Sequence, residues 1–203
     1  MDKVKSLESK TQEIYNSNAE EFDQQRLKNL YEKKWLDLLL NELKEGDEIL
    51  DVGCGAGEPI ARYFIEKGMK VTGVDFSTEM IRLAAKRFPQ SQWFVTDMRQ
   101  LNLNRKFKAI IAWDSFFHLK QDDQLLTFSL FNKHLSDDGI IMLTVGHEKG
   151  EVTGRVNNHE VYHSSLSPEE YKELIKKHNF MIIDFVLTDP ECNDHTVLIA
   201  KKS

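Results

Sequence analysis

The sequence is poor in cysteine, and its two cysteines, Cys54 and Cys192, have neither a metal-binding spacing nor the number for a disulfide framework. Long apolar runs are also missing, since no stretch approaches the roughly 20 residues that a membrane helix needs. The first ten residues are polar and charged, without the apolar core of a signal peptide. We therefore expect a cytoplasmic protein that does not span a membrane.

An excess of positive charge is absent as well. The chain has 27 Lys and Arg against 33 Asp and Glu, a net charge of -6. Nonspecific nucleic-acid binding needs a basic footprint, so this balance argues against such a partner. With only four prolines and ten glycines, no linker stands out, and neither repeats nor low-complexity segments are visible. A single domain over residues 1–203 is expected.

What the chain does contain is a change from helical to strand periodicity. Residues 6–44 repeat apolar side chains at a spacing of three and four, which predicts a helix, part of an N-terminal helical cap over residues 1–45. Beyond it, apolar runs without polar alternation predict buried strands. These runs cover residues 48–52, 70–75, 93–96, 109–113, 139–145, 180–187 and 196–200. Helices are predicted between them, after Pro59, after a Ser77 cap, over 122–135 and after the Ser167 capping box.

Strands that alternate with helices imply parallel pairing, and unalternated apolar strands imply a sheet covered on both faces. Only residues 189–195 separate the last two strands, which favours an antiparallel pair. The predicted fold is therefore α/β: an open, doubly wound, seven-stranded sheet, mostly parallel with an antiparallel last strand, plus N-terminal helices. Ligands of such sheets bind beyond the carboxyl ends of the strands.

The loop after the first strand is the strongest local signal. It reads Asp51-Val-Gly-Cys-Gly-Ala-Gly57, and its glycines permit a sharp turn and the close approach of a ligand to the backbone. A dinucleotide fingerprint requires a third glycine where Glu58 stands, and no Gly-Lys-Ser/Thr follows for a P-loop. Acidic residues at 51 and 58 suit a ligand with cationic groups and no phosphate better than a pyrophosphate.

Asp-Val-Gly-Cys-Gly-Ala-Gly resembles motif I of the class I S-adenosylmethionine-dependent methyltransferases, and ordered motifs continue over about residues 45–147. The resemblance implies a Rossmann-like methyltransferase fold and a reaction in which S-adenosylmethionine gives its methyl group to an acceptor and becomes S-adenosylhomocysteine. It further implies that Asp75 accepts hydrogen bonds from the ribose hydroxyls and that Asp97 accepts one from the adenine amino group. The cofactor-binding residues that it implies are Asp51, Gly53, Cys54, Gly55, Gly57, Asp75, Phe76, Met80, Asp97, Met98 and Trp113.

The acceptor site is less legible. The segment after the fourth strand, Trp113-Asp-Ser-Phe-Phe-His-Leu, lacks the Pro-Pro-Tyr and Pro-Cys motifs of nucleic-acid and glutamine methyltransferases, and so resembles small-molecule enzymes. Histidine is the usual base near pH 7. The candidate catalytic residues are Asp114, His118 and His163, and the candidate acceptor contacts are His147, Arg155, Tyr162 and His195.

Two segments are expected to cover this site. Residues 147–166 have no clear period and are predicted to cover the acceptor, either as a loop or as a small hairpin that turns at Asn157-Asn158. Tyr15 and Phe22 are expected to close over the cofactor from the N-terminal side. No metal constellation is visible. Two alternatives stay open: a cofactor-binding regulatory protein of the same fold without turnover, and a nicotinamide-dependent oxidoreductase. The acceptor and the oligomeric state are not specified by the sequence.

Overall fold

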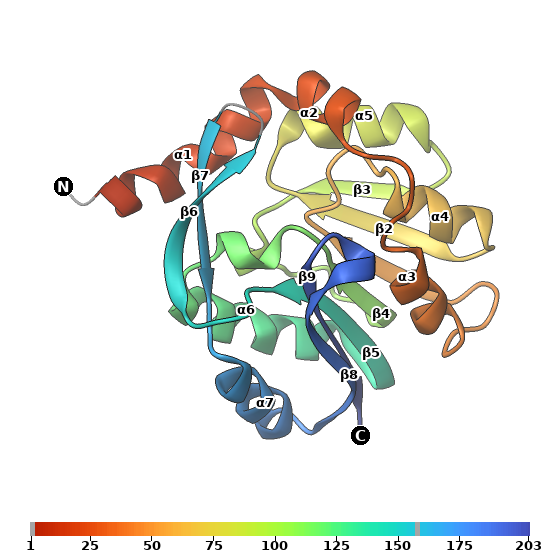
Figure 1. Cartoon of the computed structure of the whole chain (residues 1–203). Helices are drawn as coiled ribbons and strands as arrows, with labels where there is room; N and C mark the ends of the chain where they lie inside the picture. The colour runs from red at the N-terminus through yellow and green to blue at the C-terminus, as the bar shows by residue number, and fades with distance from the viewer. Residues whose placement is uncertain (1–2, 157–158) are drawn as a thin grey trace.

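The computed structural model describes residues 3–156 and 159–203. Its main sheet has seven strands in the order β3-β2-β1-β4-β5-β9-β8 (Figure 1). The strands are β1 (Glu48–Val52), β2 (Lys70–Asp75), β3 (Gln92–Val95), β4 (Phe107–Ala112), β5 (Leu135–Val145), β8 (Phe180–Asp189) and β9 (His195–Lys202). Five of them, β1 to β5, run parallel, and β9 runs antiparallel to both β5 and β8. The predicted fold class is confirmed.

Helices cover both faces of this sheet, which is why its central strands are apolar throughout. On one face α6 (Gln121–His134) and α7 (Pro168–Lys177) pack with Phe128, Phe131 and Tyr171 against the sheet. On the other, α3 (Lys33–Leu40) and α4 (Ile60–Glu66) contribute a second apolar layer. The predicted capping box of Ser167 starts α7, and Ser77 Oγ caps α5 (Thr78–Arg87) through the amide of Met80.

The N-terminal cap is not the single helix expected over residues 6–44. It contains α1 (Lys3–Ser17), α2 (Ala19–Gln25) and α3, and residues 26–32 are not helical. Leu30 has a φ of 53°, which ends helical geometry there, and Leu27 of the expected apolar stripe is 57% exposed. The cause is tertiary: Arg26, Tyr31 and Glu32 leave the helical path to bind one another and Asp114.

The segment after β5 forms a hairpin of β6 (Gly150–Val156) and β7 (His159–Ser165). Of the two forms considered for residues 147–166, the hairpin is therefore correct, although Asn157 and Asn158 themselves lie outside the described residues. The hairpin rises from the end of β5 and reaches α1, against which β7 packs (Figure 1). Over the described residues, none of the helices is long and apolar enough to cross a bilayer.

Candidate active site

The glycine loop leaves β1 with three left-handed residues. Gly53, Gly55 and Gly57 have φ values of 72°, 52° and 79°, a region that glycine adopts without steric cost. The three glycines are nevertheless not equivalent. Gly53 and Gly55 line cavities, whereas a Cβ at Gly57 would lie 3.0 Å from the ring of Phe88 and 3.1 Å from Trp93. Gly57 therefore serves helix packing, and it is not among the residues that line those cavities.

Asp75, at the end of β2, is tied to this loop. Its carboxylate accepts hydrogen bonds from the backbone amides of Gly55 at 2.9 Å and Ser77 at 2.8 Å. Burial raises its pKa to about 6, although the two amides oppose the shift. A buried carboxylate with free lone pairs beside the glycine turn is suited to accept two hydroxyl donors.

Two cavities meet over the glycine loop and form one cleft. The Asp75 cavity, about 340 Å³, is lined by the residues assigned to adenosine: Asp75, Phe76, Asp97 and Met98. The Asp51 cavity, about 290 Å³, is lined on its side by Asp51, Cys54 and Trp113. Residues common to both are Tyr15, Gly53, Gly55, Met80, Asp114 and His118. Ten of the eleven cofactor-binding residues expected from the sequence thus border one continuous cleft.

Asp51 is the acid at the other end of the cleft from Asp97. It is 4% exposed, and its pKa is raised to about 7 by burial and by the nearby charge of Asp75. Asp97 is different, because Arg99 binds its carboxylate with both Nε and Nη2 and helps to hold its pKa below the usual range against the effect of burial. Of the three acids assigned to the cofactor, Asp97 is therefore already paired, and Asp51 and Asp75 are buried and ionise with difficulty.

Glu58 was expected to favour a ligand with cationic groups, but its charge is already balanced by cations of the chain itself. It lines the Asp51 cavity, but its carboxylate is engaged by Arg62, by Lys28 at 3.0 Å and by Arg87 at 3.5 Å. Burial opposes its ionisation, yet these cations hold its pKa below the usual range. Glu58 thus anchors α4 and the segment after α2, and its charge is already compensated.

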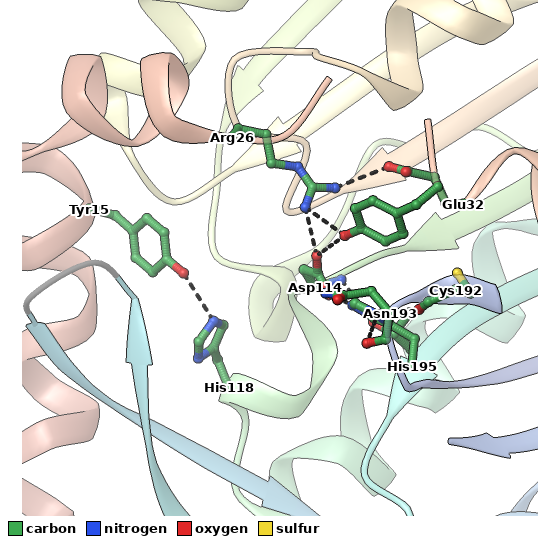
Figure 2. Close-up of polar contacts among 10 residues, drawn as sticks. Tyr15, Arg26, Glu32, Asp114, His118, Cys192, Asn193 and His195 are labelled. Atoms are coloured by element: carbon green, nitrogen blue, oxygen red, sulfur yellow. Dashed lines mark hydrogen bonds and ion pairs between the residues drawn. The ribbon is translucent and has the colours of Figure 1, made fainter. Parts of the chain in front are cut away.

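Asp114 is the centre of a buried polar network that is drawn in Figure 2. One carboxylate oxygen accepts from Arg26 at 2.9 Å, and the other from His195 Nε2 at 2.7 Å. Arg26 also binds Glu32, which is fully buried, and the hydroxyl of Tyr31. The network joins the loop after β4, the break in the N-terminal cap and the start of β9. Sequence reasoning missed Arg26, Tyr31 and Glu32, because nothing local marks them as partners of Asp114.

The surroundings of His195 favour its charged form. Its Nδ1 faces the carbonyl of Cys192 at 2.8 Å and its Nε2 faces the Asp114 carboxylate, so each nitrogen has an acceptor for its proton when the ring is an imidazolium. Burial opposes this charge, but Asp114 and the carbonyls raise the pKa of His195 above its ordinary value. The ring also stacks on Trp113, with centroids 5.5 Å apart, which favours a cation.

We expect Asp114→Asn to lower the pKa of His195, because burial then acts without the opposing charge. The stability that His195 contributes is complete below its unfolded pKa of about 6.5 and is lost as pH rises through the higher folded pKa. NMR titration of the histidine rings measures the shift. His178, which packs against Phe128 far from this network, is the internal control and keeps its pKa. An unchanged His195 pKa in the variant contradicts the assignment.

His118 is neutral and points into the cleft. Its Nδ1 lies 2.9 Å from the carbonyl of Tyr162 and so donates, which leaves Nε2 to accept from the Tyr15 hydroxyl at 3.2 Å (Figure 2). Burial lowers the pKa of His118 and raises that of Tyr15. The pair bridges the cleft from α1 to the turn after β4. Phe22 also lines the Asp51 cavity, so both residues expected from the N-terminal cap reach it.

The remaining candidate residues for catalysis and acceptor binding do not all lie at the cleft. His163 lines the Asp51 cavity, and its ring centroid is 4.9 Å from that of His118. Tyr162 is 1% exposed and reaches the site through its carbonyl. His147 is largely exposed and borders a separate cavity, and Arg155 is exposed on β6 and is not among the residues lining the cleft. The described structure therefore brings Asp114, His118, His163 and His195 together and leaves His147 and Arg155 apart.

The doubly wound sheet, the glycine turn and the acids after β1, β2 and β3 define a class I S-adenosylmethionine-dependent methyltransferase. The model of the methyltransferase domain family matches residues 20–184, and the chain belongs to that family. A relative from Streptomyces venezuelae, named dTDP-3-amino-3,4,6-trideoxy-alpha-D-glucopyranose N,N-dimethyltransferase, is 31% identical over 53% of this chain and 46% of its own length. The chain spans about half the length of the first curated relatives that it matches.

Solved structures agree on the fold. An S-adenosylmethionine-dependent methyltransferase from Clostridium acetobutylicum superposes with a TM-score of 0.72 at 20% identity, covering 94% of this chain and 99% of that one. CalS10, an amino pentose methyltransferase from Micromonospora echinaspora solved with S-adenosylmethionine bound, gives 0.70 at 15% identity, over 94% and 97% of the two chains. At these identities the likeness concerns the fold.

Proposed function

We propose that this chain binds S-adenosylmethionine in the cleft and transfers its methyl group to a small-molecule acceptor. The observation that carries the proposal is the junction of the two cavities over Gly53 and Gly55, with Asp75 and Asp97 at one end and Asp51 at the other. Adenosine fits the end with Asp75, and the methionine part, with its cationic groups, fits the end with Asp51. Buried acids on both sides disfavour the pyrophosphate of a nicotinamide dinucleotide.

The bound cofactor supplies an activated methyl group, whose C–S bond breaks as the acceptor lone pair forms the new bond and sulfur leaves as a neutral thioether. The chain's own part is alignment and exclusion of water. Tyr15 and His118 cross the cleft where its two halves meet, and Asp114 borders both halves. His118, neutral with Nε2 as its acceptor atom, is positioned to receive the acceptor proton once Tyr15 releases it.

The proposal includes the chemical class of the acceptor and the cellular compartment. The amino-sugar names of the relatives support a small molecule rather than a nucleic acid as acceptor, and the net charge of -6 agrees. The cytoplasm is the proposed compartment, supported by two buried cysteines that are not in disulfides.

Calorimetric titration with S-adenosylmethionine, S-adenosylhomocysteine and NADH tests the function. We expect binding of the first two and none of NADH. Failure of both methionine-derived ligands to bind at millimolar concentration would falsify the proposal. Binding of NADH would instead favour the alternative function, a nicotinamide-dependent oxidoreductase. Binding without methyl transfer to any member of a broad panel of amines and alcohols would favour the regulatory alternative.

Cofactor affinity should rise with pH. The pKa of Asp51 is raised to about 7, so below that pH this carboxyl is mostly protonated, and a cationic ligand must expel the proton on binding. We expect affinity for S-adenosylmethionine to increase by up to about tenfold per pH unit below pH 7 and to level off above it. Calorimetry in two buffers of different ionisation enthalpy measures the proton release. Asp51→Asn should bind more weakly and show a flatter pH dependence, while a wild-type affinity that does not change between pH 5.5 and 8 contradicts the idea.

A further inference from the structure

A third cavity lies next to the cleft and is not explained by cofactor binding. This hairpin chamber, about 330 Å³ and open to solvent, is bordered by β6 and β7, the end of β5 and the turn between β8 and β9. Its walls include Phe117, Val145, Val152, His163 and His195. Val152 contributes an apolar side chain to this wall and is 62% exposed.

The chamber and the cleft share part of their wall. Phe117 and His163 line both the chamber and the Asp51 cavity. Beside them, His195 borders the chamber while its partner Asp114 borders the cleft. The chamber therefore adjoins the methionine end of the cleft at these side chains.

His163 is the part of this wall with unused hydrogen-bonding capacity. Its ring packs at 4.7 Å from Phe117 and 4.9 Å from His118, measured between centroids, and Nε2 is buried with no partner among the described residues. Burial lowers the pKa of His163 to about 4, so the ring is neutral near pH 7. A buried nitrogen without a partner is costly and needs an explanation, such as a ligand that satisfies it.

The opposite strand makes room for this ring. A Cβ on Gly154 would lie 2.3 Å from Cε1 and 2.5 Å from Nδ1 of His163. Gly154 does not have a positive φ, so its backbone does not require glycine. The glycine is needed because the imidazole occupies the space of its missing side chain, and this contact fixes where the ring lies.

Resting on the methyl transfer proposed above, we propose that the hairpin chamber holds the acceptor, a small molecule with an apolar body and an O–H or N–H nucleophile. The nucleophile reaches past Phe117 into the Asp51 cavity, and His163 Nε2 accepts the hydrogen bond that orients it there. Its lone pair forms the bond to the methyl carbon as the C–S bond breaks, sulfur leaves as the thioether, and the proton passes to His118 as proposed above.

The chamber is lined by three exposed titratable groups, His147, Glu148 and Asp194, and by others that are already paired. His195 is paired with Asp114, and Lys149 with Glu170 at 2.5 Å. The hydroxyls are engaged as well, since Ser164 donates to the Leu119 carbonyl and Thr196 accepts from the Thr188 amide. His163 is left as the polar group in the shared wall that can recognise a nucleophile.

The test uses the full chain, labelled with ¹⁵N-histidine and saturated with S-adenosylhomocysteine. Aniline, phenol and toluene are the probes, because they share one apolar body and are uncharged at pH 7, and only toluene lacks a hydrogen-bond donor. We expect aniline or phenol to shift the ring nitrogens of His163 and to bind roughly 3- to 10-fold more tightly than toluene. His178 should not shift.

Gly154→Ala displaces the ring and should remove this preference for a donor, as should His163→Ala. Glu151→Ala, an exposed change on the same strand, is the control and keeps it. Unmoved His163 signals, or toluene binding as tightly as the other two, overturn the proposal about the chamber. Binding of S-adenosylhomocysteine is measured separately in each sample, so its failure would count against the methyltransferase function and not against the chamber alone.

Discussion

Replacing Asp75 by alanine is expected to weaken binding of S-adenosylmethionine and S-adenosylhomocysteine by about 10- to 100-fold. The carboxylate borders the Asp75 cavity, where it can accept the two ribose hydroxyls proposed as its partners. It also holds the amide of Gly55 at 2.9 Å, so its removal loosens the loop that lines the rest of the cleft. Both effects act on ligand binding, and calorimetry measures their sum.

The control is Glu79→Ala, which removes a carboxylate from the first turn of α5, four residues further on. Glu79 pairs with Arg82 on the surface and does not line either cavity of the cleft, so its loss should leave the affinity unchanged. Asp75→Asn keeps one acceptor oxygen and should fall between alanine and wild type. An Asp75→Ala variant that binds with wild-type affinity rejects the ribose role.

The main sheet was predictable because its signals are local. Apolar runs between glycines and capping residues mark the strands, and the predicted bounds of β2 agree with the structure at both ends. The acids follow the strands at the edge where parallel strands end together, so their convergence follows from the fold itself. This explains why Asp51, Asp75 and Asp97 are found around one cleft.

The contacts of the N-terminal cap were not predictable in the same way. Arg26 is 88 residues from Asp114 in sequence, and Tyr15 is 103 from His118. Such pairs leave no period or spacing in the chain. The helical pattern of residues 6–44 holds for α1, α2 and α3 but fails over residues 26–32, where Arg26 pairs with the buried Glu32 outside helical geometry.

The charge state of each histidine was also invisible in the sequence. His118 and His163 are expected to be neutral because burial lowers their pKa values, while the carboxylate of Asp114 raises the pKa of His195 and favours its charged form. The sequence made His118 and His163 catalytic candidates and His195 an acceptor contact, but it did not indicate which of them is charged. Their environments leave His118 and His163 able to accept a proton, whereas His195 is favoured in the form that already carries one.

Gly53→Ala is expected to be the most disruptive single change in the loop. A Cβ at Gly53 would lie 2.2 Å from Cβ of Ser115, and Ser115 cannot retreat easily because its hydroxyl donates to the Val52 carbonyl at 2.7 Å. The left-handed φ of 72° adds a cost of about 1 kcal/mol for alanine, and relief of the overlap by backbone movement costs about 1–3 kcal/mol more. Urea unfolding measures the loss of stability, and calorimetry should show cofactor binding reduced more than tenfold.

Gly46→Ala separates the two causes. Gly46 has a φ of 86°, but a Cβ there meets nothing within 4 Å, so its alanine variant should lose only the conformational part, about 1 kcal/mol. The double variant Gly53→Ala/Ser115→Gly removes the overlapping Cβ and should recover part of the stability lost by Gly53→Ala. If Gly53→Ala and Gly46→Ala are equally destabilised, the overlap with Ser115 is not what requires glycine. If the double variant regains stability, glycine is required at position 53 because the loop after β4 packs against it. Any requirement from cofactor binding would then be additional.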